Sequence, residues 1–561
     1  MFTIFPSFPK AVGSAPTTHD KATILVALVA LSGIGFAVVQ FWFPRALEKL
    51  LRLIENRKLW VPVYACFLAL YLFALACNTA YPGYLEHIEP RIASVSFVLL
   101  KGWPLYHGMD ATQRYSSFYG PMAYLPYTFA LWLLGANVLS LKIVVLLANL
   151  LTMILLWRCY RRLLDPAQVW LVIAVIVSYL LTYDYVFQVR GDVLLILSVA
   201  LGLYAAGADS APVSVLLLAV ACAFAVDIKV TALLYFLPLY ALLLRNRGWD
   251  RAALAVLVAA GFAFLPFVSS VVSLSRYLEW MHMASREPLT RAETLRTLKF
   301  LPFVLAPLAV LILQAKRRNV LAAYCTQNRT FLIVLGASLA AVTIAASKIG
   351  AGPHHFLPFY PILGYACADL YKQTTMAARM PSLLLRLNFI PLLWVWVVIA
   401  ISIQVGTAFP QTVATLVTSR SQASSIANDL EAVMNSHPGK TIEMGYGGWN
   451  STYQLTYFRP ALVFAGNPLT VDGEALTDMQ LCGITIPHGT LEYLKQCKTQ
   501  VWLIPKNQEP FSIVNVYSLI APRLFPVRRL FSDEFRQAFF RHYEKQGSSR
   551  YFDIWACKVS S

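Results

Sequence analysis

The chain has 561 residues, of which 58% are hydrophobic and 13% charged, and its net charge is +18. A soluble domain typically carries about 25% charged residues, so this composition excludes an ordinary soluble protein. The positive charge does not indicate a nucleic-acid partner, because the basic residues lie in short loops between apolar blocks.

The apolar residues are grouped in blocks of roughly twenty, the length that a helix needs to cross about 30 Å of hydrocarbon. The blocks predict an all-α polytopic membrane protein with about twelve transmembrane helices. They lie near residues 22–43, 60–78, 138–157, 168–188, 193–207, 212–227, 230–244, 252–272, 299–315, 330–347, 354–371 and 388–406.

Five basic clusters set the expected topology. They lie at residues 45–58, 158–162, 245–251, 316–318 and 372–386. Loops rich in Lys and Arg are typically cytoplasmic, and they also contact anionic lipid head groups. The loop 79–137, residues 275–298 and 348–353, and the tail from about 407 then face outward. The apolar stretch 120–135 is expected to lie on the surface or re-enter, because a crossing there would reverse four of the five clusters.

Three regions follow from this reading: residues 1–59, an N-terminal transmembrane helix with a basic cytoplasmic segment; residues 60–406, the main transmembrane module; and residues 407–561, an extracytoplasmic domain. From about residue 420 the apolar blocks stop, and a strand-like run at Val501–Ile504 appears beside an amphipathic run at Phe535–Tyr543. These patterns predict a small C-terminal α/β domain. On an oxidising face, Cys482 and Cys497 are candidates for a disulfide.

Ionisable residues gather at several junctions that are predicted to face outward. Such residues are costly at membrane depth and are functional candidates by default. The junctions together bring carboxylates and cations to one membrane surface, which predicts a site there. The candidates are Glu86, His87, Glu89 and Arg91 in the first loop, then Arg190 and Asp192, Lys229, Lys348, His354 and His355.

These residue types fit one kind of chemistry. A carboxylate, Glu86 or Glu89, can deprotonate an acceptor hydroxyl as a general base. The cations Arg190, Lys229 and Lys348 can bind a phosphate and stabilise the charge that develops as it departs. A base opposite a phosphate clamp is what transfer from a polyprenyl-phosphate sugar requires.

At these residues the sequence resembles the GT-C superfamily of membrane glycosyltransferases, and in particular its bacterial branch related to protein O-mannosyltransferases and aminoarabinose transferases. The resemblance covers roughly residues 60–400. It rests on the acidic pair of the first loop, a G-x-x-L-Y element at Gly102–Tyr106, Y-G-P at Tyr119–Pro121, R-x-D at Arg190–Asp192, Lys229, and HHFLPFYP from His354.

The resemblance implies a lipid-phosphate sugar donor, inversion at the anomeric carbon and an acidic base in the first outer loop. Family members often carry adjacent Asp and Glu there, whereas here Ile88 precedes Glu89 and Glu86 lies three residues before Glu89. Which glutamate is the base therefore stays open. In a helix, this spacing would place both on one face.

The remaining candidates are expected to contact substrate: His87, Arg91, Tyr119, Asp192, His354 and His355. Several of the candidate residues also have a simpler interpretation. Glu86 and Glu89 are also typical of solvated loop carboxylates, Arg190 and Asp192 of an ion pair at a helix end, and Tyr119 of an interfacial belt.

The sequence thus predicts a glycosyltransferase of the bacterial inner membrane whose site faces the periplasm or exterior. Its partners would be a polyprenyl-phosphate-sugar donor, a glycan, lipid or protein acceptor, and membrane lipids. We expect no cofactor and no metal, because the outer loop has no D-x-D pair. The alternatives are a transporter or flippase of lipid-linked saccharides, and a non-catalytic subunit of polysaccharide assembly. A transporter typically places its charges near the midplane in repeated halves, and the sequence has no such repeat.

Overall fold

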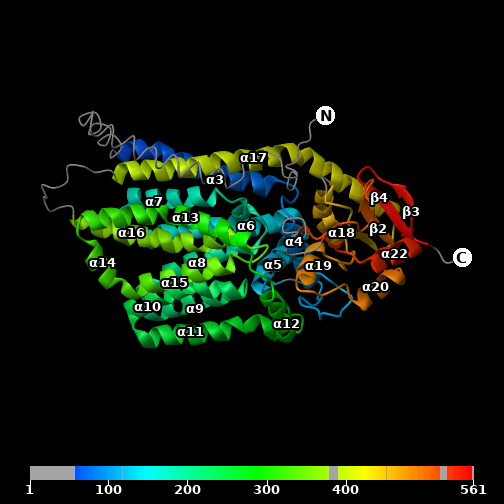
Figure 1. Ribbon diagram of the computed structural model, residues 1–561, viewed down its shortest axis with the longest axis horizontal. Coiled ribbons are helices and arrows are strands. Elements are labelled where there is room, and N and C mark those ends of the chain that lie inside the picture. Colours follow the sequence, from blue (N-terminus) through cyan, green and yellow to red (C-terminus); the bar gives the residue numbers. More distant parts are fainter. Residues whose placement is uncertain (1–56, 117, 378–389, 450–451, 518–526, 559–561) are drawn as a thin grey trace.

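The structure, a computed structural model, describes residues 57–116, 118–377, 390–449, 452–517 and 527–558. The expected N-terminal transmembrane block at 22–43 lies outside these residues. Figure 1 shows a bundle of helices at one end of the molecule and a small domain with a β-sheet at the other. One long helix, α17, extends from the bundle to the small domain.

Long apolar helices make up the bundle. They are α3 (Arg57–Ala80), α6 (Val138–Tyr160), α7 (Pro166–Leu180), α8 (Gly191–Ala206), α9 (Ala211–Val226), α10 (Leu233–Arg247), α11 (Trp249–Ala263), α13 (Arg291–Arg317), α14 (Leu321–Gln327), α15 (Arg329–Ala345), α16 (Tyr360–Ala377) and α17 (Ile390–Ser436).

Four helical stretches in the described residues are long and apolar enough to cross a membrane: Val61–Ala80, Val138–Tyr160, Trp249–Val268 and Arg291–Arg317. The bent pair α14 and α15 makes a possible fifth. Large apolar side chains such as Leu257, which is 70% exposed, cover the outside of the bundle. A water-exposed surface rarely tolerates such a face, so the chain is an integral membrane protein. The figure of about twelve spans stays a prediction.

The loop 79–137, named the outer loop because the sequence predicts that it faces outward, contains short helices: α4 (Ile88–Leu100), the 3₁₀ turn η1 (Pro121–Ala123) and α5 (Leu125–Leu134). With ten residues, α5 is about 15 Å long, too short to cross about 30 Å of hydrocarbon. This agrees with the expectation that residues 120–135 do not span. A further helix outside the bundle, α12 (Leu274–Ser285), follows α11.

Gly120 explains the Y-G-P element. Its N–H donates to the carbonyl of Ile228 across 3.0 Å. A Cβ at this position would lie 2.2 Å from the carbonyl oxygen of Asp227, so only glycine permits the approach. The outer loop is therefore docked on the segment that follows α9.

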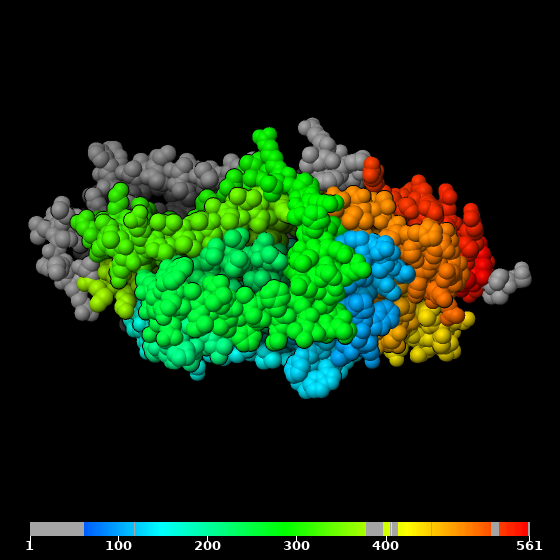
Figure 2. All heavy atoms as spheres, turned by 90° about the horizontal axis from the view of Figure 1, so that it is seen from below, coloured from blue at the N-terminus to red at the C-terminus, as the bar shows by residue number. Residues whose placement is uncertain are grey.

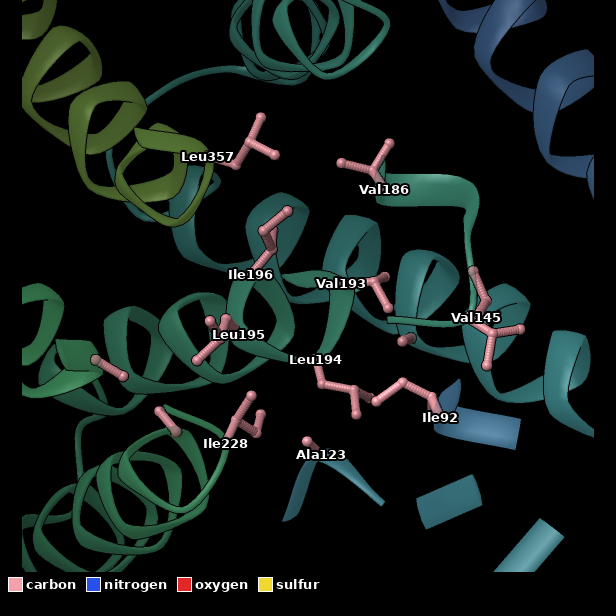
Figure 3. Close-up of a cluster of buried hydrophobic side chains, with 14 of the residues drawn as sticks. Ile92, Ala123, Val145, Val186, Val193, Leu194, Leu195, Ile196, Ile228 and Leu357 are labelled. Atoms are coloured by element: carbon pink, nitrogen blue, oxygen red, sulfur yellow. The ribbon is translucent and has the colours of Figure 1, made fainter. Parts of the chain in front are cut away.

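The hydrophobic core behind this contact is drawn in Figure 3, where Ile92, Ala123, Leu194 and Ile228 lie close together. All four are buried, with Ile92, Ala123 and Ile228 at 0% exposure. They come from α4, η1, α8 and the segment after α9. This packing fixes the backbone from which several candidate site residues project.

The C-terminal domain contains a four-stranded sheet in the order β1-β2-β4-β3. Strands β1 (Ile442–Met444) and β2 (Val501–Pro505) are parallel, whereas β4 (Phe552–Cys557) pairs antiparallel with both β2 and β3 (Tyr543–Ser548). The helical elements of the domain are η6 (Tyr453–Phe458), α18 (Arg459–Phe464), α19 (Gly473–Leu481), α20 (His488–Lys495) and α22 (Asp533–His542). The predicted strand at 501–504 and the predicted amphipathic helix from 535 are confirmed. Helix α17 runs through position 407, where the sequence predicts the tail to begin.

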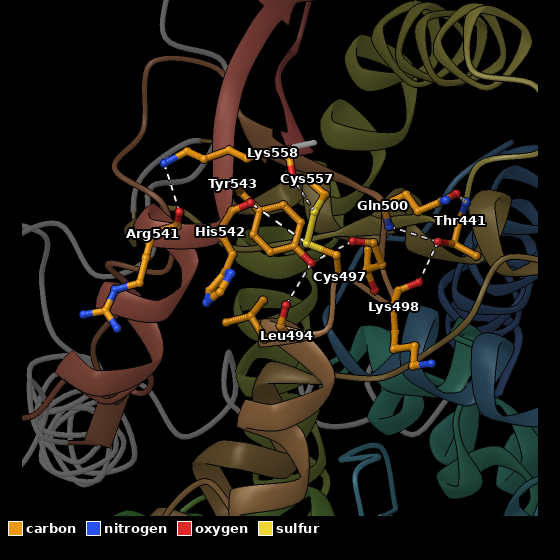
Figure 4. Close-up of a disulfide and its surroundings, with 11 residues drawn as sticks. Thr441, Leu494, Cys497, Lys498, Gln500, Arg541, His542, Tyr543, Cys557 and Lys558 are labelled. Carbon is orange, nitrogen blue, oxygen red and sulfur yellow. Dashed lines mark hydrogen bonds between the residues drawn. A yellow bond between two sulfur atoms is a disulfide. The ribbon is translucent and has the colours of Figure 1, made fainter. Parts of the chain in front are cut away.

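The predicted disulfide between Cys482 and Cys497 is wrong. Cys497 is bonded to Cys557 (Figure 4), and Cys482 is free, with its thiol donating to the carbonyl of Met283. The pairing of β2 with β4 brings the end of β4 beside the residues that precede β2, and Cys557 N donates to Gln500 O across 3.0 Å. Sheet pairing, not nearness in sequence, selects the partner.

Candidate active site

Glu86 and Arg190 form the centre of the candidate site. Glu86 lies between α3 and α4, and Arg190 caps the N-terminus of α8. Arg190 Nη1 donates to Glu86 Oε2 across 2.9 Å, and Arg190 Nε donates to Asp192 Oδ2 across 2.9 Å. The guanidinium lies over the ring of Tyr185, 4.1 Å from its centroid. One buried cation thus orders two carboxylates from different parts of the chain.

His87 extends this network toward the C-terminal domain. Its Nδ1 contacts Glu86 Oε1, and its Nε2 lies 3.7 Å from Glu474 Oε2 on α19. Burial opposes its charge, but Glu474 and Glu86 outweigh burial and raise the pKa of His87 to about 9. Burial also opposes the charge on Glu86, but His87 and Arg190 lower the pKa of that carboxyl to about 2. Glu86 is therefore ionised throughout the physiological range.

Glu89 is held differently. Helix α4 begins at Ile88, so Glu86 precedes the helix and the two carboxylates do not share a helical face, contrary to the expectation for a continuous helix. Glu89 is 0% exposed, and its two oxygens accept from the N–H groups of Leu85 at 2.6 Å and Val189 at 2.8 Å. Burial raises its pKa despite the nearby ammonium of Lys142. This geometry is that of a group that ties the outer loop to the segment before α8.

Arg91 binds the C-terminal domain. It is buried, its Nε lies 3.5 Å from Asp472 Oδ1, and its Nη1 lies 3.6 Å from Asp478 Oδ2. The backbone of Arg114 pairs with the same region, donating to Thr470 O at 2.7 Å and accepting from Asp472 N at 2.8 Å. Figure 2 shows the outer loop, in blue, between the green bundle and the orange and red C-terminal domain. The C-terminal domain is thus part of the wall of the site.

Lys229 follows α9 and lies beside the 3₁₀ turn η5 (Pro353–Phe359). Its Nζ is 3.2 Å from Nε2 of His355. The ring of His354 packs edge-on against Tyr185, with centroids 5.2 Å apart. The guanidinium of Arg190 packs on the same ring of Tyr185. Arg190 therefore shares one neighbourhood with Lys229, His354 and His355.

Lys348 lies beside the end of α12 and the residues that follow it. Its Nζ donates to the carbonyl of Ala284 across 2.9 Å. Burial raises the pKa of Glu287 to about 7, while the ammonium groups of Lys348 and Lys229 act to lower it. Glu287 therefore lies near both lysines. Tyr119 also belongs to the neighbourhood of Arg190, because the charges of Arg190 and Asp192 act on its hydroxyl. Its backbone carbonyl accepts from the hydroxyl of Tyr106.

Two sets of residues near the site could not be predicted from the sequence. Asp472, Glu474 and Asp478 belong to the C-terminal domain, outside the region of family resemblance, and no local pattern connects them with the first loop. Glu287 lies in the segment 275–298, which the sequence predicts to face outward, and a single carboxylate there does not by itself indicate a site. Within the described ranges, no three His, Cys, Asp or Glu side chains are placed to share a metal ion.

No protein-family model matches the chain, and no curated protein sequence matches it significantly. The structure is similar to that of ArnT from Cupriavidus metallidurans in the apo state, with a TM-score of 0.51 and 14% identity over 89% of this chain and 97% of that one. It is equally similar to ArnT from the same organism bound to undecaprenyl phosphate, with a TM-score of 0.50 and 14% identity over 89% of this chain and 98% of that one. The chain therefore shares the fold of ArnT, which agrees with the GT-C-like fold that the sequence predicts.

Proposed function

We propose that this chain is a membrane glycosyltransferase that moves a sugar from a polyprenyl-phosphate donor to an acceptor hydroxyl on the extracytoplasmic face of the bacterial inner membrane. The observation that carries the proposal is the Glu86–Arg190 contact, with Lys229 in the same neighbourhood. This neighbourhood combines an ionised carboxylate with cations suited to a phosphate. The GT-C fold supports the proposal, since a structure of ArnT with the same fold is bound to undecaprenyl phosphate.

The reaction is a single displacement. A Glu86 oxygen takes the proton of the acceptor hydroxyl. The acceptor oxygen forms a bond to the anomeric carbon as the bond from that carbon to the phosphate oxygen breaks, which inverts the configuration. The bonding pair leaves with the polyprenyl phosphate, whose added negative charge is stabilised by Lys229 and Arg190. Arg190 is buried and Lys229 is half-buried, so water screens them less than at an open surface and this stabilisation is stronger.

Glu86 is the better candidate for the base. Both oxygens of Glu89 already accept from buried backbone N–H groups, so deprotonating an acceptor would require breaking one of these bonds. Glu86 Oε2 also accepts from a backbone N–H, that of Ile88 at 2.9 Å, and from Arg190, but its Oε1 contacts the side chain of His87, which an acceptor can displace without breaking a backbone hydrogen bond. Asp192 orients Arg190 from the other side.

The test is transfer by purified protein from a panel of radiolabelled polyprenyl-phosphate sugars to envelope glycans, lipids and proteins. A labelled product with inverted anomeric configuration supports the proposal. Reconstituted vesicles provide the control. If no sugar is transferred but labelled lipid crosses the bilayer, the chain is a transporter and the proposal fails.

A further inference from the structure

A cavity lies where the start of the outer loop, helix α17 and turn η6 meet. Its empty space is about 480 Å³, including its open mouth. Three tyrosines, Tyr81, Tyr84 and Tyr457, form part of its wall. Thr415, Ser419 and Gln422 of α17 add polar groups.

The described lining of this cavity has no charged side chain. The neighbouring site, in contrast, contains Glu86, His87 and Arg190. The cavity walls offer aromatic faces together with hydroxyl and amide groups. This is the lining that suits a neutral ring with many hydroxyls, whose C–H faces pack on aromatic rings while its hydroxyls form hydrogen bonds.

Two polar atoms of the wall have no hydrogen-bond partner among the described residues. They are the hydroxyl of Tyr84, a residue that is 6% exposed, and Oε1 of Gln454. A buried polar atom without a partner costs about 1–3 kcal/mol, so such atoms call for a partner. Both atoms are almost inaccessible, so a ligand hydroxyl would reach them as their side chains turn toward the cavity; it would then donate to Gln454 Oε1, and it could donate to or accept from the Tyr84 hydroxyl.

The cavity is connected to the candidate base. Leu85 lines the cavity and directly precedes Glu86. On the opposite wall, the ring of Tyr457 packs edge-on against Tyr453, whose hydroxyl donates to Glu474 across 3.1 Å. The charges of Glu86 and Glu474 both act on the hydroxyl of Tyr457, so a ring in the cavity would lie near Glu86.

We propose that this cavity binds the acceptor, and that the acceptor is an uncharged saccharide ring at the point of attachment. The inference rests on the proposed transferase function, and it adds the class of acceptor and the surface that recognises it. The described lining offers no cation to a ring that carries phosphate or carboxylate, and Lys142, behind Tyr81, already donates to the carbonyls of Asn78 and Tyr81. Burial of such a ring is therefore strongly unfavourable.

The first test is the change Tyr84→Phe, which removes only a hydroxyl that has no hydrogen-bond partner among the described residues. It should raise the KM for the saccharide acceptor up to about tenfold, the loss of one hydrogen bond, and leave the KM for the donor unchanged. The matched control is Tyr324→Phe in α14, at the far end of the bundle, where a buried hydroxyl likewise has no hydrogen-bond partner in the described part of the chain. If both variants have the acceptor KM of the wild type, the proposal is wrong.

The second test does not need turnover. Cysteine is introduced at Gln422, which lines the cavity, or at the exposed neighbour Ser421, which does not. Mass spectrometry of the peptide follows the modification of the cysteine by a thiol reagent. The rate is measured in the presence of neutral methyl glycosides, of the matching dodecyl glycosides in nanodiscs, or of sugar 6-phosphates.

Neutral glycosides should slow modification at position 422, in proportion to occupancy, and not at 421. Protection by methyl glycosides indicates a free glycan, and protection by dodecyl glycosides alone indicates a lipid-linked one. No protection by any neutral glycoside, or equal protection by sugar phosphates, would overturn the proposal. Protection at 422 in a protein that transfers no sugar would show that the binding site is real and the transferase function wrong.

Discussion

Arg190 donates to Glu86 across 2.9 Å, although the two residues lie 104 positions apart in the chain. Their side chains are 4% and 16% exposed. The contact joins the start of the first outer loop to the N-terminus of α8, and it keeps Glu86 ionised. It also places the candidate base in direct contact with the cation that we assign to the phosphate. The predictions below separate the residues that act at this contact from those that support it.

Glu89→Gln should reduce stability rather than turnover. A glutamine can accept with only one of its two terminal atoms, so either Leu85 or Val189 loses its acceptor, and a buried N–H without a partner costs about 1–3 kcal/mol. Thermal unfolding should detect this loss, while kcat per folded molecule should change little. A large fall in kcat at unchanged stability would instead identify Glu89 as the base.

Lys229→Ala should weaken donor binding by about ten- to a hundredfold, the value of a lost hydrogen bond to a charged group. Lys229→Arg keeps the charge and should recover part of the affinity. The measurement is the Kd for an undecaprenyl phosphate analogue beside kcat at saturating donor. A fall in kcat with unchanged Kd would remove Lys229 from the phosphate clamp.

Arg91→Met should loosen the C-terminal domain from the outer loop. It leaves Asp472 without one of its two buried cations, and breaking a buried pair in this way costs about 3–5 kcal/mol. Limited proteolysis should cleave the variant faster than the wild type between the bundle and the domain. The control is Arg276→Ala on α12, whose ion pair with Glu279 is exposed and should contribute about 0–1 kcal/mol. Equal cleavage of the two variants would contradict the assignment.

His87 should make stability depend on pH. Its folded pKa, about 9, lies above its ordinary value of 6.5, because Glu474 and Glu86 outweigh burial and the repulsion of Arg190. A raised pKa stabilises the fold fully below pH 6.5, and this stabilisation is lost as the pH rises through about 9. Glu86, with a pKa of about 2, stays ionised across this range. The unfolding temperature of the wild type should therefore fall from pH 6.5 to 9 more than that of His87→Gln. Parallel curves would refute this.

The sequence was sufficient for the membrane class, for the fold shared with ArnT and for most of the charged residues that lie together in the structure. Apolar blocks predict membrane helices and basic loops predict the side of each loop, and both patterns can be recognised within short stretches of the sequence. Gly120 shows how a short motif reflects a long-range contact, since its role becomes clear only beside Asp227.

The missed features depend on contacts between distant segments. The roles of Glu86 and Glu89 diverge because α4 begins between them, and the pattern of charges does not fix that boundary. Glu474 reaches His87 only because the C-terminal domain docks on the first loop. The partner of Cys497 is likewise set by the pairing of β2 with β4.

The most direct test of the account compares Glu86→Gln with the wild type in transfer from a radiolabelled polyprenyl-phosphate sugar, with donor Kd and unfolding temperature measured on the same samples. Removal of a general base typically lowers the rate by about 10²–10⁴-fold. We predict a fall in kcat of this size, with donor binding and folding retained. Transfer by Glu86→Gln at the rate of the wild type would contradict the assignment of Glu86 and the mechanism built on it.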